Sequence, residues 1–282
     1  MDPIIDKFND SRILRINQDN MGLTRSLNKG LQLARGEYVA RMDADDISMQ
    51  RRLEAQVQEM DTDSRLDLVG AFFDVIDGNK RLIETKELIL DPLYRLWRLQ
   101  FHNNYGHGSM MLRKRAILNA GLYDERLKYA QDFDLWSRVS RKDNTKIVPE
   151  VLYRYRMVEK GRQASVKYYD DQLAAAIAVS NNSLTACNPR LSEADCAEVR
   201  ALYWEFQLKG VSERGLSLLP ETLEGFCLRY GIDGPEKAGL VRRVALDALG
   251  EIEKSERMSP AERADMIRRF SRFAADPLTG MT

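Results

Sequence analysis

The chain has 282 residues, 44% of them hydrophobic, and its 43 basic and 43 acidic side chains give a formal net charge of zero. This length and composition suffice for one large domain or two small ones with a sizeable core, so the expected class is globular. The charge balance excludes a strongly basic nucleic-acid binder, and an anionic ligand must be held locally, by a metal ion or by backbone amides.

The search for targeting segments and the cysteine pattern narrow the expected protein class and its location. No stretch approaches the ~20 apolar residues of a membrane span, and the first residues lack the order of a secretory signal, so the expected location is the cytoplasm. Three cysteines without a CxxC pair argue against a disulfide framework or a zinc cluster and for buried thiols. With only two histidines, a catalytic scheme built on several histidines is excluded.

The first half of the chain alternates strand and helix patterns. A β-type run at 12–16 precedes helical spacing over 23–34, and a second strand follows at 37–42. Because the order strand, helix, strand builds parallel sheets, we expect an α/β fold with a mixed, mainly parallel sheet flanked by helices. Later patterns predict a helix at 51–60 and two strands joined at an Asp-Gly turn within 66–82. Two further helices follow at 92–100 and 129–142, and a last strand at 146–157.

From about residue 166 the strand patterns stop and helix starts become explicit. Segments 192–195 and 259–262 read as capping boxes, and periodicity predicts four or five helices. We therefore expect an α/β domain at 1–165 and an all-α region at 166–282. This region carries no chemical motif and is a candidate for packing on the first domain or for homo-oligomer contacts; its mixed charges make membrane contact the least favoured role.

Three carboxylates, Asp43, Asp45 and Asp46, lie between a strand and a helix in EYVARMDADDISMQRRLEAQ, residues 37–56. One interpretation is a helix cap, since Asp is a common N-cap. The other is a divalent-metal site, because Mg²⁺ and Mn²⁺ take carboxylate oxygens together with substrate phosphates. In an extended segment Asp43 and Asp45 point to the same side and address one ion or nucleotide together. Capping needs only one acid, which leaves the others unexplained.

From residue 20 to about 156 the chain resembles family-2 glycosyltransferases of the GT-A fold, an inverting group that transfers sugars from nucleotide diphosphates. The stretch NMGLTRSLNKGLQLARGEYVARMDADD follows the family's N-x-G, N-x-G, A-x-G-x-Y and D-x-D-D pattern. The segments RRLEAQV, VGAFFDVID, HGSMMLRKRAILNAGLYDE and AQDFDLWSRV follow in the family's order and approximate spacing. Each motif is weak alone, but together over about half of the chain they make a specific signal.

The resemblance implies a role for each matching acid. Asp45 is implied as a ligand of Mn²⁺ or Mg²⁺, and Asp43 as a nucleotide contact or a second ligand. Asp132 matches the second acid of the family's E-D motif, the implied catalytic base, with Gln131 in place of the usual Glu. Two acid sites suit the chemistry, because the leaving phosphates need neutralising while the acceptor hydroxyl loses its proton. The structural alternative for Asp132 is a cap on the following helix.

Four further residues are candidate substrate contacts, each with a structural alternative. Asn20 and Gly22 form a turn beside the nucleotide, or only the turn that leads into a helix. His107 contacts the diphosphate or the ion, or is a structural histidine. Trp136 stacks on an acceptor sugar, or lies half in the core at position i+4 from Asp132.

Family members open with a strand that ends in a Pro-x-Tyr-Asn motif, a helix, and a second strand that ends in Asp-Asp-Gly-Ser. This chain has no counterpart of that block, so we expect an N-terminally incomplete GT-A sheet with uncovered apolar edges. Two explanations stay open: a start upstream of Met1, or a chain without normal donor binding.

The expected function is a hexosyltransferase-type enzyme that moves a sugar from a UDP- or dTDP-sugar to a glycan or lipid-linked acceptor. It would act in polysaccharide or surface-glycan synthesis, in the cytoplasm or peripherally at the inner face of the membrane, without a nucleic-acid partner. This pathway assignment is analogy at the level of the family. The alternative, from a different class, is a catalytically inactive glycosyltransferase-like module that serves as a protein-interaction subunit.

Overall fold

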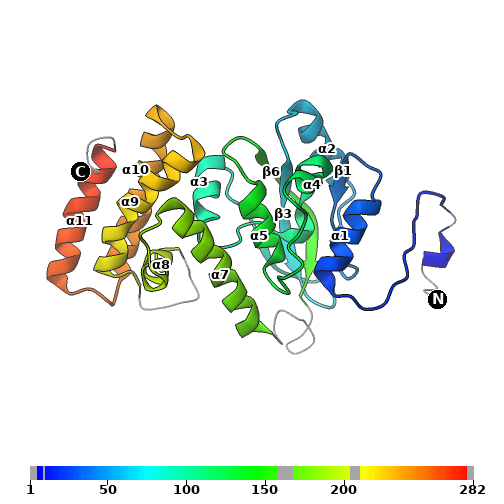
Figure 1. The fold of residues 1–282 in the computed structure, drawn as a ribbon, viewed down its shortest axis with the longest axis horizontal. Coiled ribbons are helices and arrows are strands. Elements are labelled where there is room, and N and C mark those ends of the chain that lie inside the picture. Colours follow the sequence, from blue (N-terminus) through cyan, green and yellow to red (C-terminus); the bar gives the residue numbers. More distant parts are fainter. Residues whose placement is uncertain (1–4, 9, 158–167, 204–209, 278–282) are drawn as a thin grey trace.

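The computed structural model describes residues 5–8, 10–157, 168–203 and 210–277. The molecule is elongated, with an α/β part at one end and a stack of helices at the other (Figure 1). Within the described ranges, every helix is too short or too polar to span a lipid bilayer.

The strands described form one mixed sheet: β1 (Tyr38–Ala40), β2 (Ile47–Ser48), β3 (Leu68–Ile76), β4 (Leu82–Lys86), β5 (Met111–Arg113) and β6 (Thr145–Arg156). Their order is β1-β5-β3-β6-β2, with β4 also paired to β3. Only the long strands β3 and β6 run parallel; every other described pair is antiparallel. The α/β fold is confirmed, but the expectation of a mainly parallel sheet is wrong.

The predicted strand at 12–16 is also wrong, and this explains the error in strand direction. Residues 13–22 form neither strand nor helix, and every side chain from 11 to 22 is exposed. An extended run without a neighbouring strand has no partner for its backbone hydrogen bonds. Consequently β1 has no parallel partner from an earlier strand and pairs antiparallel with β5.

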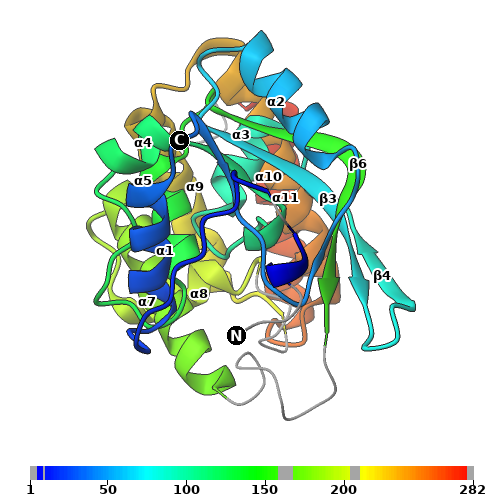
Figure 2. The ribbon, with the colours of Figure 1, turned by 90° about the vertical axis from the view of Figure 1, so that its right-hand side faces the viewer.

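Helices cover both faces of the sheet (Figure 2): α1 (Leu23–Leu33), α2 (Arg52–Thr62), α3 (Pro92–Arg98), α4 (Lys114–Asn119) and α5 (Gln131–Val139). Because side chains alternate along a strand, Leu68 joins the large core shared with α1, α4 and α5, while Val69 faces α2. A short 3-10 helix, η2 (His107–Ser109), precedes β5, and another, η1 (Ile5–Lys7), lies near the N-terminus.

The C-terminal part contains α7 (Tyr169–Cys187), α8 (Glu193–Arg200), α9 (Glu213–Tyr230), α10 (Gly234–Lys254) and α11 (Pro260–Ala275). The predicted all-α character is confirmed, and both capping boxes are present, at the N-termini of α8 and α11. The boundary that we place near residue 165 lies outside the described residues.

One buried core joins the two parts. Trp97 of α3 packs edge-on against Phe226 of α9, with ring centroids 5.1 Å apart, and its indole N–H donates to the Tyr203 hydroxyl at 2.9 Å. Buried apolar side chains continue from Leu31 in α1 to Phe273 in α11. The three cysteines are buried and unpaired. The helical region therefore packs on the α/β part, the first of the roles considered for it.

Candidate active site

The acidic motif forms a turn after β1. The Asp46 amide donates to the Asp43 carbonyl at 3.3 Å. The expectation that Asp43 and Asp45 point to the same side assumed an extended segment, and this assumption is wrong. Side chains alternate with a period of two only in extended chain. The helix-cap interpretation is also wrong, because the residue at the N-cap of α2 is Arg51.

Asp46 anchors this turn to the end of β6. Its carboxylate is buried and accepts hydrogen bonds from the Tyr153 hydroxyl and, at 2.7 Å, from the Arg156 amide. Burial raises the pKa of Asp46, and the two hydrogen bonds oppose this shift. The third acid of the motif is thus structural, which explains why the motif has more acids than a ligand needs.

The two other acids of the motif remain accessible. The Asp43 side chain is 39% exposed and forms an ion pair with the guanidinium of Arg41, which is itself only 11% exposed. Asp45 is exposed, and its backbone carbonyl accepts from Arg156 Nε at 2.6 Å. Within the described residues the Asp45 carboxylate has no partner, so it is available to a ligand.

A cavity of about 270 Å³ opens beside Asp43 and Arg41. Two glycines of the loop around η2 shape it: a Cβ at Gly106 would lie 2.6 Å from Phe73 Cε1, and one at Gly108 would lie 2.5 Å from Tyr153 Cζ. Only glycine lets the backbone come this close to the two rings. The aromatic side chains of β3 and β6 therefore form one wall, and the glycine loop forms another.

A buried arginine fixes the backbone on both sides of this cavity. Arg52 of α2 donates from Nη2 to the carbonyls of Arg41 at 2.9 Å and Met110 at 3.2 Å. Its guanidinium also lies 4.8 Å from the centre of the Tyr153 ring. Burial lowers the pKa of Arg52 to about 10, so it stays protonated at neutral pH. Arg52 thereby ties the acidic motif to the glycine loop.

His107 connects the cavity with Asp132. His107 lines the cavity, its Nδ1 lies 4.0 Å from Asp132 Oδ2, and its Nε2 lies 2.8 Å from the Tyr123 hydroxyl oxygen. Burial lowers the pKa of His107 far below its ordinary value, against the opposing charge of Asp132. Burial also raises the pKa of Tyr123. A neutral imidazole with its proton on Nδ1, beside the carboxylate, and Nε2 accepting from the phenol satisfies both contacts.

Asp132 lies in the first turn of α5, where two donors orient its carboxylate. Asn103 Nδ2 donates to Oδ2 at 2.8 Å, and the Phe133 amide donates to Oδ1 at 2.9 Å. The N-cap position belongs to Ala130, which has a left-handed φ of 54°. Asp132 is therefore not the cap of this helix. Its side chain is 18% exposed, so solvent and ligands reach it.

Of the predicted site residues only Asp43 and His107 line the cavity; Asp45 neighbours it in the acidic turn, and Asp132 lies next to it behind His107. The remaining predicted residues lie elsewhere. Trp136 is fully buried and packs edge-on against His107 at 5.8 Å, so the predicted stacking on a sugar is wrong and the ring serves as support. Asn20 Oδ1 accepts from the Gly22 amide at 3.1 Å in an exposed turn at the start of α1, with φ of 85° at the glycine. Neither of these two residues lines the cavity.

Several residues of the site escaped the sequence analysis: Arg41, Arg52, Asn103, Tyr123 and Tyr153. The sequence did indicate a role for Arg41, since this residue stands two positions before Asp43 at the end of a strand. It did not indicate the partners of Asp132 and Asp46, because Asn103 and Tyr153 are 29 and 107 positions away from them in the chain.

The donor set suits a hard divalent ion shared with a substrate. No cluster of three His, Cys, Asp or Glu side chains occurs in the described ranges. Asp43 and Asp45 instead offer carboxylate oxygens from one turn, and among the described residues those of Asp45 have no other partner. Mg²⁺ or Mn²⁺ held by one or two carboxylates and by substrate phosphates fits this set. A zinc site closed by protein ligands does not.

Comparisons with known proteins show which proteins this chain resembles. Residues 2–122 match the family described as Glycosyl transferase family 2. The chain is 33% identical over 159 residues to the uncharacterized glycosyltransferase MJ1057 of Methanocaldococcus jannaschii, covering 55% of this chain and 54% of that protein. It is 32% identical over 151 residues to the amylovoran biosynthesis glycosyltransferase AmsE of Erwinia amylovora, covering 51% and 56%. The chain thus spans about half the length of these relatives.

A solved structure shares the fold over nearly the whole chain. The crystal structure of S. aureus TarS 1-349 in complex with UDP-GlcNAc superimposes with a TM-score of 0.51 at 15% identity. The match covers 98% of this chain and 81% of that one. At this identity the likeness shows the fold, a GT-A-like α/β part followed by a helical region.

Proposed function

We propose that this chain, whose residues 2–122 match glycosyl transferase family 2, transfers a sugar from a nucleoside diphosphate to an acceptor hydroxyl at the cavity beside Asp43. The position of His107 carries this proposal, because this residue lines the cavity and its ring lies next to Asp132. The cavity is lined by the Arg41–Asp43 ion pair and lies beside an oriented carboxylate. These groups supply what the reaction needs, contacts for a metal-bound diphosphate and a proton acceptor.

Asp132 acts as the general base in this proposal. The acceptor oxygen attacks the anomeric carbon, its proton passes to Asp132, and the bond between that carbon and the diphosphate oxygen breaks. Asn103 holds the carboxylate before the substrate arrives. The neutral His107 adds no positive charge that would weaken the base. Attack from the side opposite the leaving group inverts the anomeric configuration.

Arg41, Asp43 and Asp45 form the donor side of the site. Arg41 lines the cavity, and the N–H groups of its guanidinium that are not paired with Asp43 are donors for phosphate oxygens. Asp43 and Asp45 would hold Mg²⁺ or Mn²⁺, an ion that, when bound, neutralises charge on a leaving diphosphate. Arg52 keeps the backbone of Arg41 in place through its hydrogen bond to the carbonyl.

The proposed donor is a UDP- or dTDP-sugar, and the proposed acceptor is a growing glycan or a lipid-linked sugar. AmsE is named for the biosynthesis of amylovoran, which supports a role in polysaccharide assembly. TarS was solved with UDP-GlcNAc, which makes a UDP-sugar the first donor to test.

The test is donor turnover by the purified chain. UDP-sugars with Mn²⁺ should release UDP, and Asp132→Asn should lower kcat by about 10²- to 10⁴-fold, the usual contribution of a general base. Asp45→Asn should raise the Mn²⁺ concentration needed for half-maximal rate. Asp143→Asn, an exposed acid outside the cavity, is the matched control and should leave both values unchanged.

Wild-type rates in Asp132→Asn and Asp45→Asn would refute the site assignment. Calorimetric titration with UDP and Mn²⁺ separates this proposal from the inactive, protein-binding module. A metal-dependent heat that Asp45→Asn abolishes supports the enzyme, whereas no heat with wild-type protein supports the module.

A further inference from the structure

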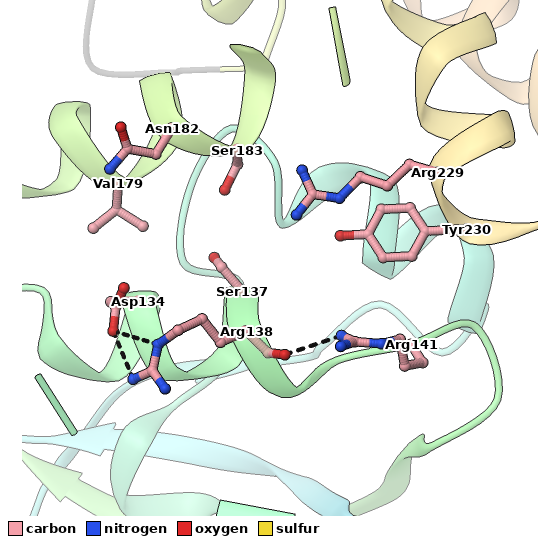
Figure 3. A pocket seen from close by; sticks show the side chains of 9 residues that line it. All are labelled: Asp134, Ser137, Arg138, Arg141, Val179, Asn182, Ser183, Arg229 and Tyr230. Atoms are coloured by element: carbon pink, nitrogen blue, oxygen red, sulfur yellow. Dashed lines mark hydrogen bonds and ion pairs between the residues drawn. The ribbon is translucent and has the colours of Figure 1, made fainter. Parts of the chain in front are cut away.

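A second cavity, of about 450 Å³, lies where α5 meets α7 and the end of α9 (Figure 3). It shares no lining residue with the cavity beside Asp43. Val179 is its one apolar lining side chain, and the others are charged, hydroxyl or amide groups. Such a lining differs from the mostly apolar walls of ordinary small-molecule sites. The chemistry of this cavity is therefore set by charge and hydrogen bonds.

The charges in the cavity do not balance. Asp134 is its only acid, and its Oδ2 accepts from Nε and Nη2 of Arg138 at 2.9 and 2.7 Å, so this pair is neutral. Arg141 uses Nη1 on backbone carbonyls at the end of α5, and Arg229 lies 5.5 Å from the Tyr230 ring centre. Neither arginine has a carboxylate partner in the described part of the chain. Two positive charges thus remain uncompensated.

Hydrogen-bond donors from the helical region surround these charges. The Ser183 hydroxyl points from α7 toward the side chains of α5, and the Tyr230 hydroxyl points in from α9 (Figure 3). Asn182 of α7 also lines the cavity. Ser183 is only 8% exposed, and its hydroxyl has no hydrogen-bond partner among the described residues. The cavity therefore holds more donors and positive charge than its own acceptors satisfy.

We propose that this cavity binds a phosphate ester, carried by a soluble sugar or by a lipid headgroup. A guanidinium group binds phosphate oxygens through two parallel N–H donors. Arg141 approaches the space from the segment that follows α5, and Arg229 approaches it from α9. Hydroxyl and amide donors of α7 complete the coordination of an anion. Because Arg141 comes from the α/β part and Arg229 from the helical region, the bound phosphate ties the two parts together.

Calorimetry with glucose 1-phosphate tests the proposal for a soluble ligand. The titration contains EDTA and no nucleotide, so it reports no binding that needs a metal at Asp45. Wild-type protein should bind glucose 1-phosphate but not glucose, and Arg141→Gln/Arg229→Gln should weaken binding by about tenfold or more, since hydrogen bonds to charged groups are lost. Arg242→Gln/Arg272→Gln removes the same charge from exposed positions outside the cavity and should bind like wild type.

Vesicles of phosphatidylcholine with a polyprenyl diphosphate test the lipid source in a flotation assay. Binding of either probe that depends on Arg141 and Arg229 supports the proposal and identifies the source. Arg229→Gln alone, which leaves the Arg141 contacts at α5 intact, should also weaken binding. Absence of binding to both probes by wild type, or equal binding by the double variant, overturns the proposal. Asp45→Asn should bind normally, so failure of the proposed transferase function leaves this test valid.

Discussion

Lowering the pH from 7 to 5 should destabilise this protein through His102. The side chain follows α3, and its Nδ1 is buried without a hydrogen-bond partner among the described residues. Burial, and then the charge of Arg98, lower the pKa of His102 to about 4 from an ordinary value of 6.5. Between these pH values the imidazole of His102 is protonated in the unfolded chain but not in the folded chain. The contribution of this neutral histidine to the free energy of unfolding is therefore fully present above pH 6.5 and is lost as the pH falls toward 4.

The size of the effect follows from the two pKa values. One unit of pKa difference corresponds to about 1.4 kcal/mol, and integration from pH 7 to pH 5 gives a loss of about 2 kcal/mol for this one group. Small globular domains have only about 5–15 kcal/mol in total, so the loss is measurable as a lower urea midpoint.

His102→Gln isolates this contribution, because glutamine does not titrate. The loss of unfolding free energy between pH 7 and pH 5 should be about 2 kcal/mol smaller in the variant than in wild type. His107 titrates in both proteins, so its contribution cancels from the comparison. Equal losses in the two proteins would refute the assignment of a depressed pKa to His102. Between pH 7.5 and pH 8.5 the stability difference between the two proteins should stay constant.

Two further changes probe the packing and the orientation of the base. Gly225→Ala in α9 would place a Cβ 2.8 Å from the Cys187 carbonyl carbon and should lower the free energy of unfolding by about 1–3 kcal/mol. The matched Gly239→Ala lies in open space on α10 and should raise the free energy of unfolding by about 0.5–1 kcal/mol. Urea denaturation measures both, and equal shifts would contradict the packing of α9 on α7. Asn103→Ala should lower kcat by about tenfold or more with little change in KM for the donor; steady-state kinetics showing an unchanged kcat would remove its positioning role.

Features set by neighbouring residues were predictable from the sequence. The Asp77-Gly78 signal marks the turn between β3 and β4, where Asp77 Oδ1 accepts from the Asn79 and Arg81 amides, both at 2.8 Å. Likewise, each predicted capping box needs only contacts within one helical turn. Turns and helix caps of this kind depend only on neighbouring residues, so the same sequence pattern marks them in any fold.

Features set by distant contacts were not predictable in this way. The run at 12–16 has a β-type composition, but a strand exists only where another strand pairs with it. The acidic motif reads as a strand end, yet Tyr153, from the last strand of the sheet, draws Asp46 into the interior and turns the chain. Which of three similar carboxylates is structural therefore depends on topology and not on the motif itself.

The helical region supports the segment of the α/β part that orients the proposed base. Ser180 of α7 donates to the Gln100 carbonyl at 2.9 Å, three positions before Asn103, which in turn donates to Asp132. On the same side, α7 packs against α5, the helix that carries Asp132. Loosening α7 should therefore disturb the carboxylate before it exposes the sheet. The change in sequence pattern near residue 165 marks a change of secondary structure, whereas the core that fixes the site extends across it.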